Sequence, residues 1–340
     1  MTDRGVTLRD VAVHAGVSTR TVSNVVNDFT HVSPAMRTKV KASLEALNYR
    51  PNLLARSLRQ GRTGIITLLV PDLTAAYFAE LAHEVVEQAA DIGMTVMVDE
   101  TGGDPARERA LLETAAESSW VDGVLLSSLG LSGEDLAGLG SRTSVVLLGE
   151  RTAGSALDHV GIDNVAAAFD AVTHLVEAGR TSIAALGGHG SPLDATSNLR
   201  LRGYTDALRA AGLPVGKLHA RAPDYRRASA RDAVDALLGR GERPDALFCF
   251  SDDLALGALR AAHEHGLGVP DDLAVVGFDD VEISRFLTPS LTSIRPDRAA
   301  IASQSLAMLV ARLDDPGGTR RDVQVRHDLV VRESSRPSLG

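Results

Sequence analysis

The chain has 340 residues, of which 44% are hydrophobic and 23% are charged. This length is too great for one compact core, so we expect more than one domain. The composition excludes a collagen-like chain, a disordered chain and a disulfide scaffold, and the single cysteine, Cys249, has no partner within the chain. The sequence contains neither a signal-peptide pattern nor an apolar run of about 18 residues, and we therefore expect a cytoplasmic protein.

The formal charge is divided unevenly along the sequence. Residues 1–62 contain ten Lys and Arg side chains against four acidic ones, a net charge of +6. The remaining residues contain 25 basic and 40 acidic side chains, a net charge of −15. A basic head on an acidic body is typical of a protein that contacts a polyanion, such as a nucleic acid, with one end only.

The segment 7–27 has the pattern of two short helices joined by a tight turn. Thr7 is expected to cap the first helix, with Asp10 in the position of a capping-box acid. Gly16 would form the turn, and Ser18 would cap the second helix. Apolar side chains recur at helical spacing on one face of each helix. Two helices joined in this way form a helix-turn-helix.

The second of these helices carries the side chains expected to read DNA. A helix-turn-helix places the start of its second helix in the major groove. Thr19, Arg20 and Asn24 lie at exposed positions there, and each can form hydrogen bonds with base edges. A third helix is predicted over residues 34–47, capped by Ser33. The side chains of this third helix that we expect to contact phosphate are Arg37, Lys39 and Lys41.

From Gly64 onward, short apolar runs alternate with amphipathic helical stretches. This alternation predicts parallel sheets with right-handed crossovers, and the number of repeating units fits two doubly wound lobes better than one sheet. The fold class is therefore an all-α head followed by an α/β body. The expected strands are 64–70, 95–98, 123–127, 144–148, 160–163, 182–186, 246–250 and 274–278, and the expected helices include 78–92, 106–117, 165–178 and 199–211.

Acidic and amide side chains directly follow several of the predicted strands. They are Asp72, the pair Asp163-Asn164, the run Ser251-Asp252-Asp253 and the pair Asp279-Asp280. Ligands of open α/β sheets bind outside the carboxyl ends of the strands, so these groups would line a cleft between the lobes. Carboxylates and amides accept hydrogen bonds from a polyhydroxylated ligand. The alternative is that each Asp or Asn caps the following helix, which is the more common role at any single position.

The chain resembles the lac/galactose repressor family in its N-terminal segments LRDVAVHAGVSTRTVSNVVND, HVSPAMRTKV and NYRPNLLARSLRQ. The resemblance covers residues 5–335 and includes VGIDNVAAAFDAVTHLVEAGRTSIAALGG, CFSDDLALGALRAAHEHGLGVPDDLAVVGFDD and FLTPSLTSIRPD. It implies a DNA-binding headpiece at 1–50, a hinge helix or linker at 51–62, and an effector-binding and dimerisation body at 63–340, similar in fold to periplasmic sugar-binding proteins. We expect lobe one at about 64–160 and 293–322, and lobe two at about 163–290 and 323–337.

The resemblance assigns DNA contacts in the head and the hinge. Leu58 matches the family's side chain that is wedged into the minor groove, a device that unstacks one base step and bends the DNA. The family most often has an arginine where this chain has Asn24, which implies an adenine or water-mediated contact in place of a guanine contact. The residues expected to contact DNA are Thr7, Ser18, Thr19, Arg20, Thr21, Ser23, Asn24, Asn27, His31, Tyr49, Asn52, Ala55 and Leu58.

The resemblance also assigns effector contacts in the body. Tyr225 matches an aromatic residue that often packs on a sugar face in the family. The family usually has Asn-Pro where this chain has Ala75-Ala76, so a polar contact from that loop is expected to be missing. The residues expected to contact the effector are Asp72, Tyr77, Phe78, Asp163, Arg200, Tyr225, Ser251, Asp252 and Asp279.

The sequence therefore predicts a transcriptional repressor that binds a palindromic operator as a homodimer and is released by a small-molecule effector. We expect a carbohydrate effector, with a purine or nucleoside effector or corepressor as the alternative, and a solute-binding protein of the same body fold as a distant one. The sequence contains no dinucleotide-binding or phosphate-binding glycine motif, no nucleophile elbow and no metal-binding histidine pair. We thus expect no catalysis, no cofactor, no metal and no membrane partner.

Overall fold

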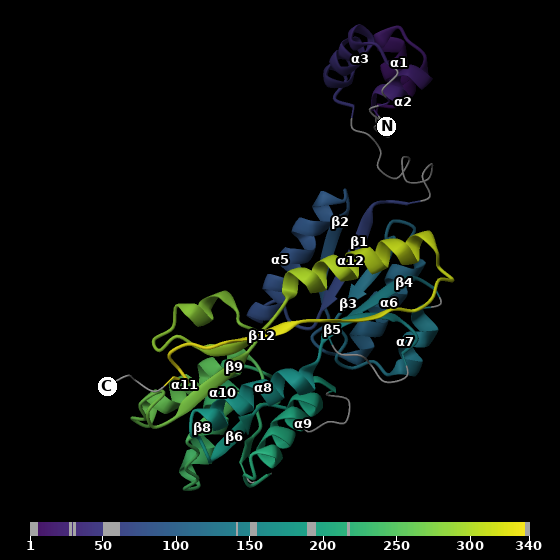
Figure 1. Cartoon of the computed structure of the whole chain (residues 1–340). Helices are drawn as coiled ribbons and strands as arrows, with labels where there is room; N and C mark the ends of the chain where they lie inside the picture. Colours follow the sequence, from purple (N-terminus) through teal and green to yellow (C-terminus); the bar gives the residue numbers. More distant parts are fainter. Residues whose placement is uncertain are drawn as a thin grey trace. The chain divides into compact units, whose positions relative to one another are not determined.

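The structure is a computed structural model that describes residues 6–26, 29, 32–49, 62–140, 142–149, 155–188, 195–215 and 218–336. The chain divides into two compact units, a head of residues Met1–Thr63 and a body of residues Gly64–Gly340 (Figure 1). Each unit has its own hydrophobic core, so each is described separately below.

The head is a bundle of three helices, α1 (Leu8–Ala15), α2 (Thr19–Val26) and α3 (Pro34–Ala46). Both parts of the predicted capping box at the start of α1 are formed, and Gly16 adopts the left-handed conformation that ends the helix. Ser33 caps α3 as expected. The small core consists of Val11, Ala12, Ala15, Val22, Val25 and Val40. The expected helix-turn-helix is confirmed.

The first lobe of the body is built on a parallel six-stranded sheet in the order β11-β5-β4-β3-β1-β2. One face packs against α5 and α12, and the other packs against α6 and α7. The strands are β1 (Ile65–Val70), β2 (Thr95–Glu100), β3 (Gly123–Leu126), β4 (Ser144–Leu148), β5 (Asp158–Ile162) and β11 (Asp322–Val325), and the helices are α5 (Ala76–Asp91), α6 (Pro105–Glu117), α7 (Gly133–Gly140) and α12 (Arg298–Asp314).

The second lobe repeats this plan with the sheet order β12-β10-β9-β8-β6-β7, in which only the β10–β12 pairing is antiparallel. Helices α8 and α9 pack against each other, as do α10 and α11 (Figure 1). The strands are β6 (Ile183–Leu186), β7 (His219–Ala220), β8 (Ala246–Cys249), β9 (Ala274–Phe278), β10 (Thr292–Pro296) and β12 (His327–Val330). The helices are α8 (Asn164–Glu177), α9 (Ala195–Ala210), α10 (Arg227–Gly239), α11 (Asp252–Glu264) and the short 3₁₀ helix η1 (Glu282–Arg285).

Glycines allow these helix pairs to approach closely. A Cβ atom added to Gly203 in α9 would lie 2.2 Å from the carbonyl oxygen of Val165 in α8. A Cβ atom added to Gly257 in α11 would lie 2.3 Å from the carbonyl oxygen of Arg227 in α10. Any other side chain at these two positions would therefore force the paired helices apart.

The chain passes between the lobes after β5, after β10 and between β11 and β12. Strand β10 belongs to the second sheet, so the chain returns to the first lobe after Pro296, slightly later than the sequence suggested. Two of the passages are joined by Asp297, which caps α12 and forms an ion pair of 3.1 Å with Arg326.

Both sheets reverse their strand order at the same point of their topology. In each lobe the first strand lies between the second and third strands of that lobe, as β2-β1-β3 and as β7-β6-β8. Connections leave the sheet in opposite directions on the two sides of such a strand, and a crevice opens at its carboxyl end. The predicted architecture of two doubly wound lobes is confirmed. A binding site is expected at the carboxyl ends of β1 and β6.

Candidate functional site

The start of α2 presents the predicted reading residues of the head. The side chains of Thr19 and Arg20 are exposed there. Ser18 caps the helix, because its hydroxyl accepts a hydrogen bond of 3.1 Å from the backbone N–H of Thr21. The hydroxyls of Ser18 and Thr21 also lie 2.9 Å apart. These caps fix the orientation of the first turn, where Thr19 and Arg20 project.

The other predicted DNA contacts have varied environments. Thr7 uses its hydroxyl in the capping box of α1, donating to the carboxylate of Asp10 over 2.6 Å. Ser23 and Asn24 are half-buried, and Tyr49 packs partly against the head core. The predicted contacts that lie outside the described residues are Asn27, His31, Asn52, Ala55 and Leu58.

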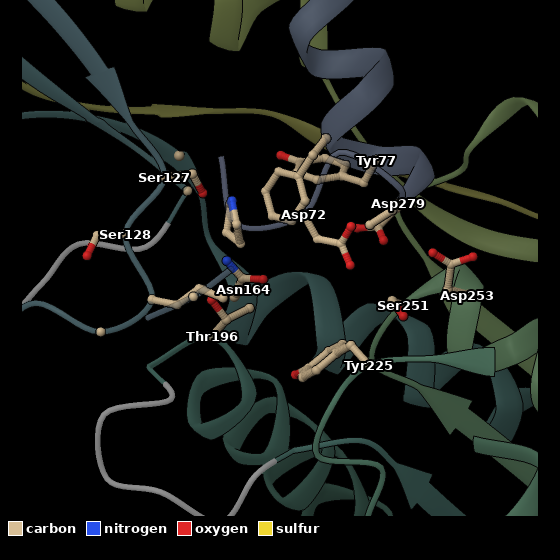
Figure 2. Close-up of a pocket in the computed structure, with 18 of the residues that line it drawn as sticks. Asp72, Tyr77, Ser127, Ser128, Asn164, Thr196, Tyr225, Ser251, Asp253 and Asp279 are labelled. Carbon is tan, nitrogen blue, oxygen red and sulfur yellow. The ribbon is translucent and has the colours of Figure 1, made fainter. Parts of the chain in front are cut away.

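The body contains a cavity of about 560 Å³ that is lined by residues of both lobes. Figure 2 shows polar and aromatic side chains that face this space from several different elements. Seven of the nine predicted effector contacts belong to its lining, and they are Asp72, Tyr77, Phe78, Arg200, Tyr225, Ser251 and Asp279. The resemblance and the strand-end rule therefore led to one site.

The remaining two predicted contacts, Asp163 and Asp252, are not among the described residues that line the cavity. Asp163 caps α8, accepting hydrogen bonds from the backbone N–H groups of Val165 and Ala166. Asp252 has no exposed surface and faces the protein interior. Both carboxylates bind groups of the protein itself in this structure, and their assignment as direct effector contacts stays a prediction.

The guanidinium group of Arg200 is held in a fixed position within the cavity wall. Its Nε donates to the amide oxygen of Asn164 over 2.8 Å, and a terminal nitrogen donates to the carbonyl oxygen of Phe250. The group lies over the ring of Phe278, 3.5 Å from its centroid. Such contacts orient a planar donor and reduce the entropy it loses on binding a ligand.

Aromatic rings face the cavity from both lobes. Tyr77 and Phe78 begin α5 in the first lobe, and their rings meet edge to face with centroids 5.2 Å apart. Tyr225 reaches the cavity from the second lobe, and its backbone has a φ of +54°. The hydroxyl of Tyr225 is hydrogen-bonded to that of Ser197, so the position of its ring is fixed. Aromatic surface is thus offered from opposite sides of the cavity (Figure 2).

A strained turn presents Asp279 to the cavity. Asp279 and Asp280 follow β9 with φ values of +116° and +48°, which side-chain-bearing residues adopt rarely. Arg298 stabilises the turn by donating to the carbonyl oxygens of both residues. Burial raises the pKa of Asp279 well above its usual range, while the nearby Arg200 acts in the opposite direction.

Several cavity residues were not predicted as contacts. Ser127 and Ser128 follow β3 directly, and Glu100 ends β2, so the strand-end rule could have found them. Asn164 and Asp253 belong to the strand-end groups that the sequence placed along a cleft, although the resemblance did not assign them as effector contacts, and both line the cavity. The sequence gives no signal for three further lining residues of the second lobe, which are Thr196 at the start of α9 and Asp224 and Arg226 in the connection before α10.

Two absences hold for the part of the chain that the structure describes. No helix there is long and apolar enough to cross a membrane. No group of three or more His, Cys, Asp or Glu side chains in those residues is arranged to hold a metal ion.

Known proteins share both parts of this arrangement. A family described as bacterial regulatory proteins of the lacI family matches residues 7–52, and a periplasmic binding protein-like domain matches residues 172–335. The chain is 32% identical to the HTH-type transcriptional repressor PurR of Photobacterium profundum over 331 residues, which cover 96% of this chain and 98% of that protein.

Solved structures give the same result. The lac repressor dimer bound to operator and the anti-inducer ONPF matches with a TM-score of 0.86 and 28% identity, covering 98% of this chain and all of that one. The complex of the transcriptional regulator CelR with cellobiose matches with a TM-score of 0.72 and 30% identity, covering 97% of this chain and 99% of that one. These relatives are transcriptional regulators and not enzymes, and the chain belongs to the lacI family of bacterial regulatory proteins.

Proposed function

We propose that the protein is a transcriptional repressor that binds a palindromic operator as a homodimer and is released when a carbohydrate occupies the cavity of the body. The observation that carries the effector half of this proposal is the cavity itself, in which aromatic rings and hydrogen-bonding groups from both lobes face one space. Effector and operator would bind to separate units of the chain, so the function is allosteric.

The DNA-binding half rests on the head. Thr19 and Arg20 are exposed at the start of the second helix of a helix-turn-helix, where side chains reach base edges. Lys39 and Lys41 are exposed on α3 and supply positive charge for phosphate contacts. A matching structure is the lac repressor dimer on its operator. A dimer of two such heads reads two half-sites, which makes its operator palindromic.

An apolar face on lobe one supports dimerisation. Val86 and Ile92, on α5 and at its end, have 38% and 53% of their surface exposed. The edge strand β2 beside this helix exposes Val98, which shares a face of the strand with Val96 in the core cluster of α5. Exposed apolar residues on a helix and on an adjacent edge strand favour burial against another protein surface. We propose that a second copy of the chain covers this face.

A carbohydrate fits the chemistry of the cavity. Carboxylates such as Asp72 accept hydrogen bonds from hydroxyl groups, and the guanidinium of Arg200 donates them. Tyr225 and the Tyr77–Phe78 pair offer apolar surface for the C–H faces of a sugar ring. The volume of about 560 Å³ is within the range of small-molecule sites. The matching CelR structure holds cellobiose.

A purine or nucleoside is the second candidate. The rings of Tyr77 and Phe78 present both an edge and a face to the cavity, and flat heterocycles stack on such groups. The relative from Photobacterium profundum is named as the repressor PurR. In this case the ligand would use the same aromatic residues but fewer of the carboxylates.

The proposal is tested by selecting random duplex DNA with the purified full-length protein, with and without pooled mono- and disaccharides. Recovery of a palindrome that is lost when sugars are added supports both halves. A palindrome that responds only to purines transfers the effector role to the second candidate. Failure to enrich any site would refute operator binding.

One substitution tests the reading residue directly. Arg20→Ala should cost about 1–3 kcal/mol of binding at a single base pair of the recovered half-site and relax the preference there. Lys41→Ala, which changes an exposed cation of α3, is the matched control and should weaken binding to all sequences equally. An unchanged base preference in Arg20→Ala would show that Arg20 does not read a base.

A further inference from the structure

The cavity lining has an excess of negative charge. Five carboxyl groups belong to it, against two guanidinium groups, those of Arg200 and Arg226. The carboxyl groups are those of Asp72, Glu100, Asp224, Asp253 and Asp279. The charge of an effector therefore matters for its affinity, because a ligand in the cavity displaces water from these groups.

Both guanidinium groups already contact other groups of the protein, and of the two only that of Arg226 forms an ion pair. Arg200 is bound to Asn164 and to the carbonyl oxygen of Phe250, and it lies on the ring of Phe278. Arg226 reaches across the cavity from the second lobe and forms an ion pair of 3.2 Å with Asp72 of the first lobe. Both cationic groups in the lining are thus already engaged by the protein.

Asp72 is well placed to hold Arg226. Its other carboxylate oxygen accepts hydrogen bonds from the backbone N–H and the hydroxyl of Thr74, at 2.8 Å and 2.5 Å. Burial acts to raise the pKa of Asp72, but the hydrogen bonds from Thr74 and the charge of Arg226 outweigh it, so the pKa is lowered. The carboxyl group therefore stays ionised at neutral pH.

We propose that Asp72 is a specificity-determining residue, which neutralises Arg226 so that the cavity accepts uncharged sugars and rejects sugar phosphates. The inference rests on the proposed carbohydrate effector. A phosphate dianion would have to displace Asp72 from Arg226 and would then face the remaining carboxylates. The uncapped start of α5 at Ala75 offers only a partial positive charge in compensation.

The experiment compares glucose with glucose 6-phosphate by titration calorimetry on the full-length protein. Asp72→Asn keeps the shape of the side chain but removes the charge that neutralises Arg226. We expect it to raise the affinity for glucose 6-phosphate relative to glucose by about tenfold, the scale of one charge-assisted hydrogen bond. Asp72→Asn combined with Arg226→Ala should lose this gain, because the released guanidinium is then absent.

Asp253→Asn is the matched control. Asp253 also lines the cavity and is also paired with an arginine, Arg227, over 2.7 Å. Arg227 is not among the described lining residues, so Asp253→Asn should give a smaller gain for the phosphate ester than Asp72→Asn, because it removes one repelling charge without releasing a cation into the cavity. Arg226→Ala alone also breaks the ion pair between Arg226 and Asp72, but it leaves no released cation in the cavity. This variant therefore distinguishes the effect of the released charge from the effect of losing a contact between the lobes.

Three results would overturn the inference: preference of the unmodified protein for glucose 6-phosphate, no gain in Asp72→Asn, or a gain that survives Arg226→Ala. The gain in Asp72→Asn can be measured even if glucose 6-phosphate is not bound by the unmodified protein. Failure of the proposed function would instead be seen in the operator assay, as a lack of release by any sugar.

Discussion

Asp252 provides a test of how the interior near the effector cavity is held together. This residue begins α11 and has no exposed surface. Its carboxylate accepts hydrogen bonds from the hydroxyls of Ser284 and Ser293, both at 2.6 Å, and from the backbone N–H of Val281 at 2.9 Å. Burial raises its pKa from 3.8 to about 7, although these hydrogen bonds oppose the change.

The sign of the pH effect follows from this shift. Because the pKa of Asp252 is higher in the folded protein than in the unfolded chain, the folded state retains a proton that the unfolded state has lost. The contribution to stability is fully present below pH 3.8 and is lost as the pH rises to about 7. At 1.36 kcal/mol per unit of pKa, the change is on the order of 4 kcal/mol.

Asp252→Asn replaces the group with a neutral one of the same shape and removes this pH dependence. Urea unfolding followed by circular dichroism between pH 4 and pH 8 would measure the free energy of unfolding of both proteins. We expect the stability of the unmodified protein relative to Asp252→Asn to fall by a few kcal/mol across this interval. If the free energies of unfolding of the two proteins instead changed in parallel with pH, the protonation of Asp252 would not contribute to stability.

Asp135→Asn is a control, because the pKa of Asp135 is shifted in the opposite direction from that of Asp252. Hydrogen bonds from Arg109 and Ser132 lower the pKa of Asp135 to about 2. Its contribution to stability is therefore present above pH 3.8 and is lost as the pH falls towards 2. Between pH 5 and pH 8 the profiles of Asp135→Asn and the unmodified protein should run parallel.

Two further predictions concern packing and charge in the body. Gly203→Ala should destabilise the protein by about 1–3 kcal/mol, because its Cβ would meet the carbonyl oxygen of Val165 at 2.2 Å. Gly239→Ala, which meets no atom within 4 Å, should be nearly neutral in the same urea titration. Asp158→Asn should cost about 3–5 kcal/mol, since it leaves the largely buried Arg312 without its charge partner at 2.9 Å. A loss below about 1 kcal/mol in a thermal melt would argue against a structural role for this ion pair.

The sequence predicted best the strands that form long apolar runs. The expected boundaries 144–148 and 274–278 are those of β4 and β9, both buried almost completely. The prediction omitted four strands: β7, which has only two residues, β10, β11 and β12. The sequence of β11, DVQV, includes a charged and a polar residue. Strand β11 forms because it pairs with β5, a contact across about 160 residues that no local pattern reveals.

The residues that line the cavity were predicted only in part for a related reason. Asp252 and Asp253 are adjacent at the start of α11, but successive residues of a helix point about 100° apart. One carboxylate therefore faces the interior and the other faces the cavity, and sequence alone does not tell which. The role of Arg226 depends on its hydrogen bond to Asp72, which lies 154 positions away in the chain, so the local sequence around Arg226 does not reveal it.

The position of β11 and β12 has a consequence for synthesis of the protein on the ribosome. These two strands form one edge of each sheet, and they are translated after all the other described strands. The head can fold early, because its core involves no residue of the body. Both lobes, in contrast, remain without an edge strand until residues 322–330 have emerged. A premature stop in α12 would therefore release a head with a complete core, attached to a body that has lost an edge strand from each of its two sheets.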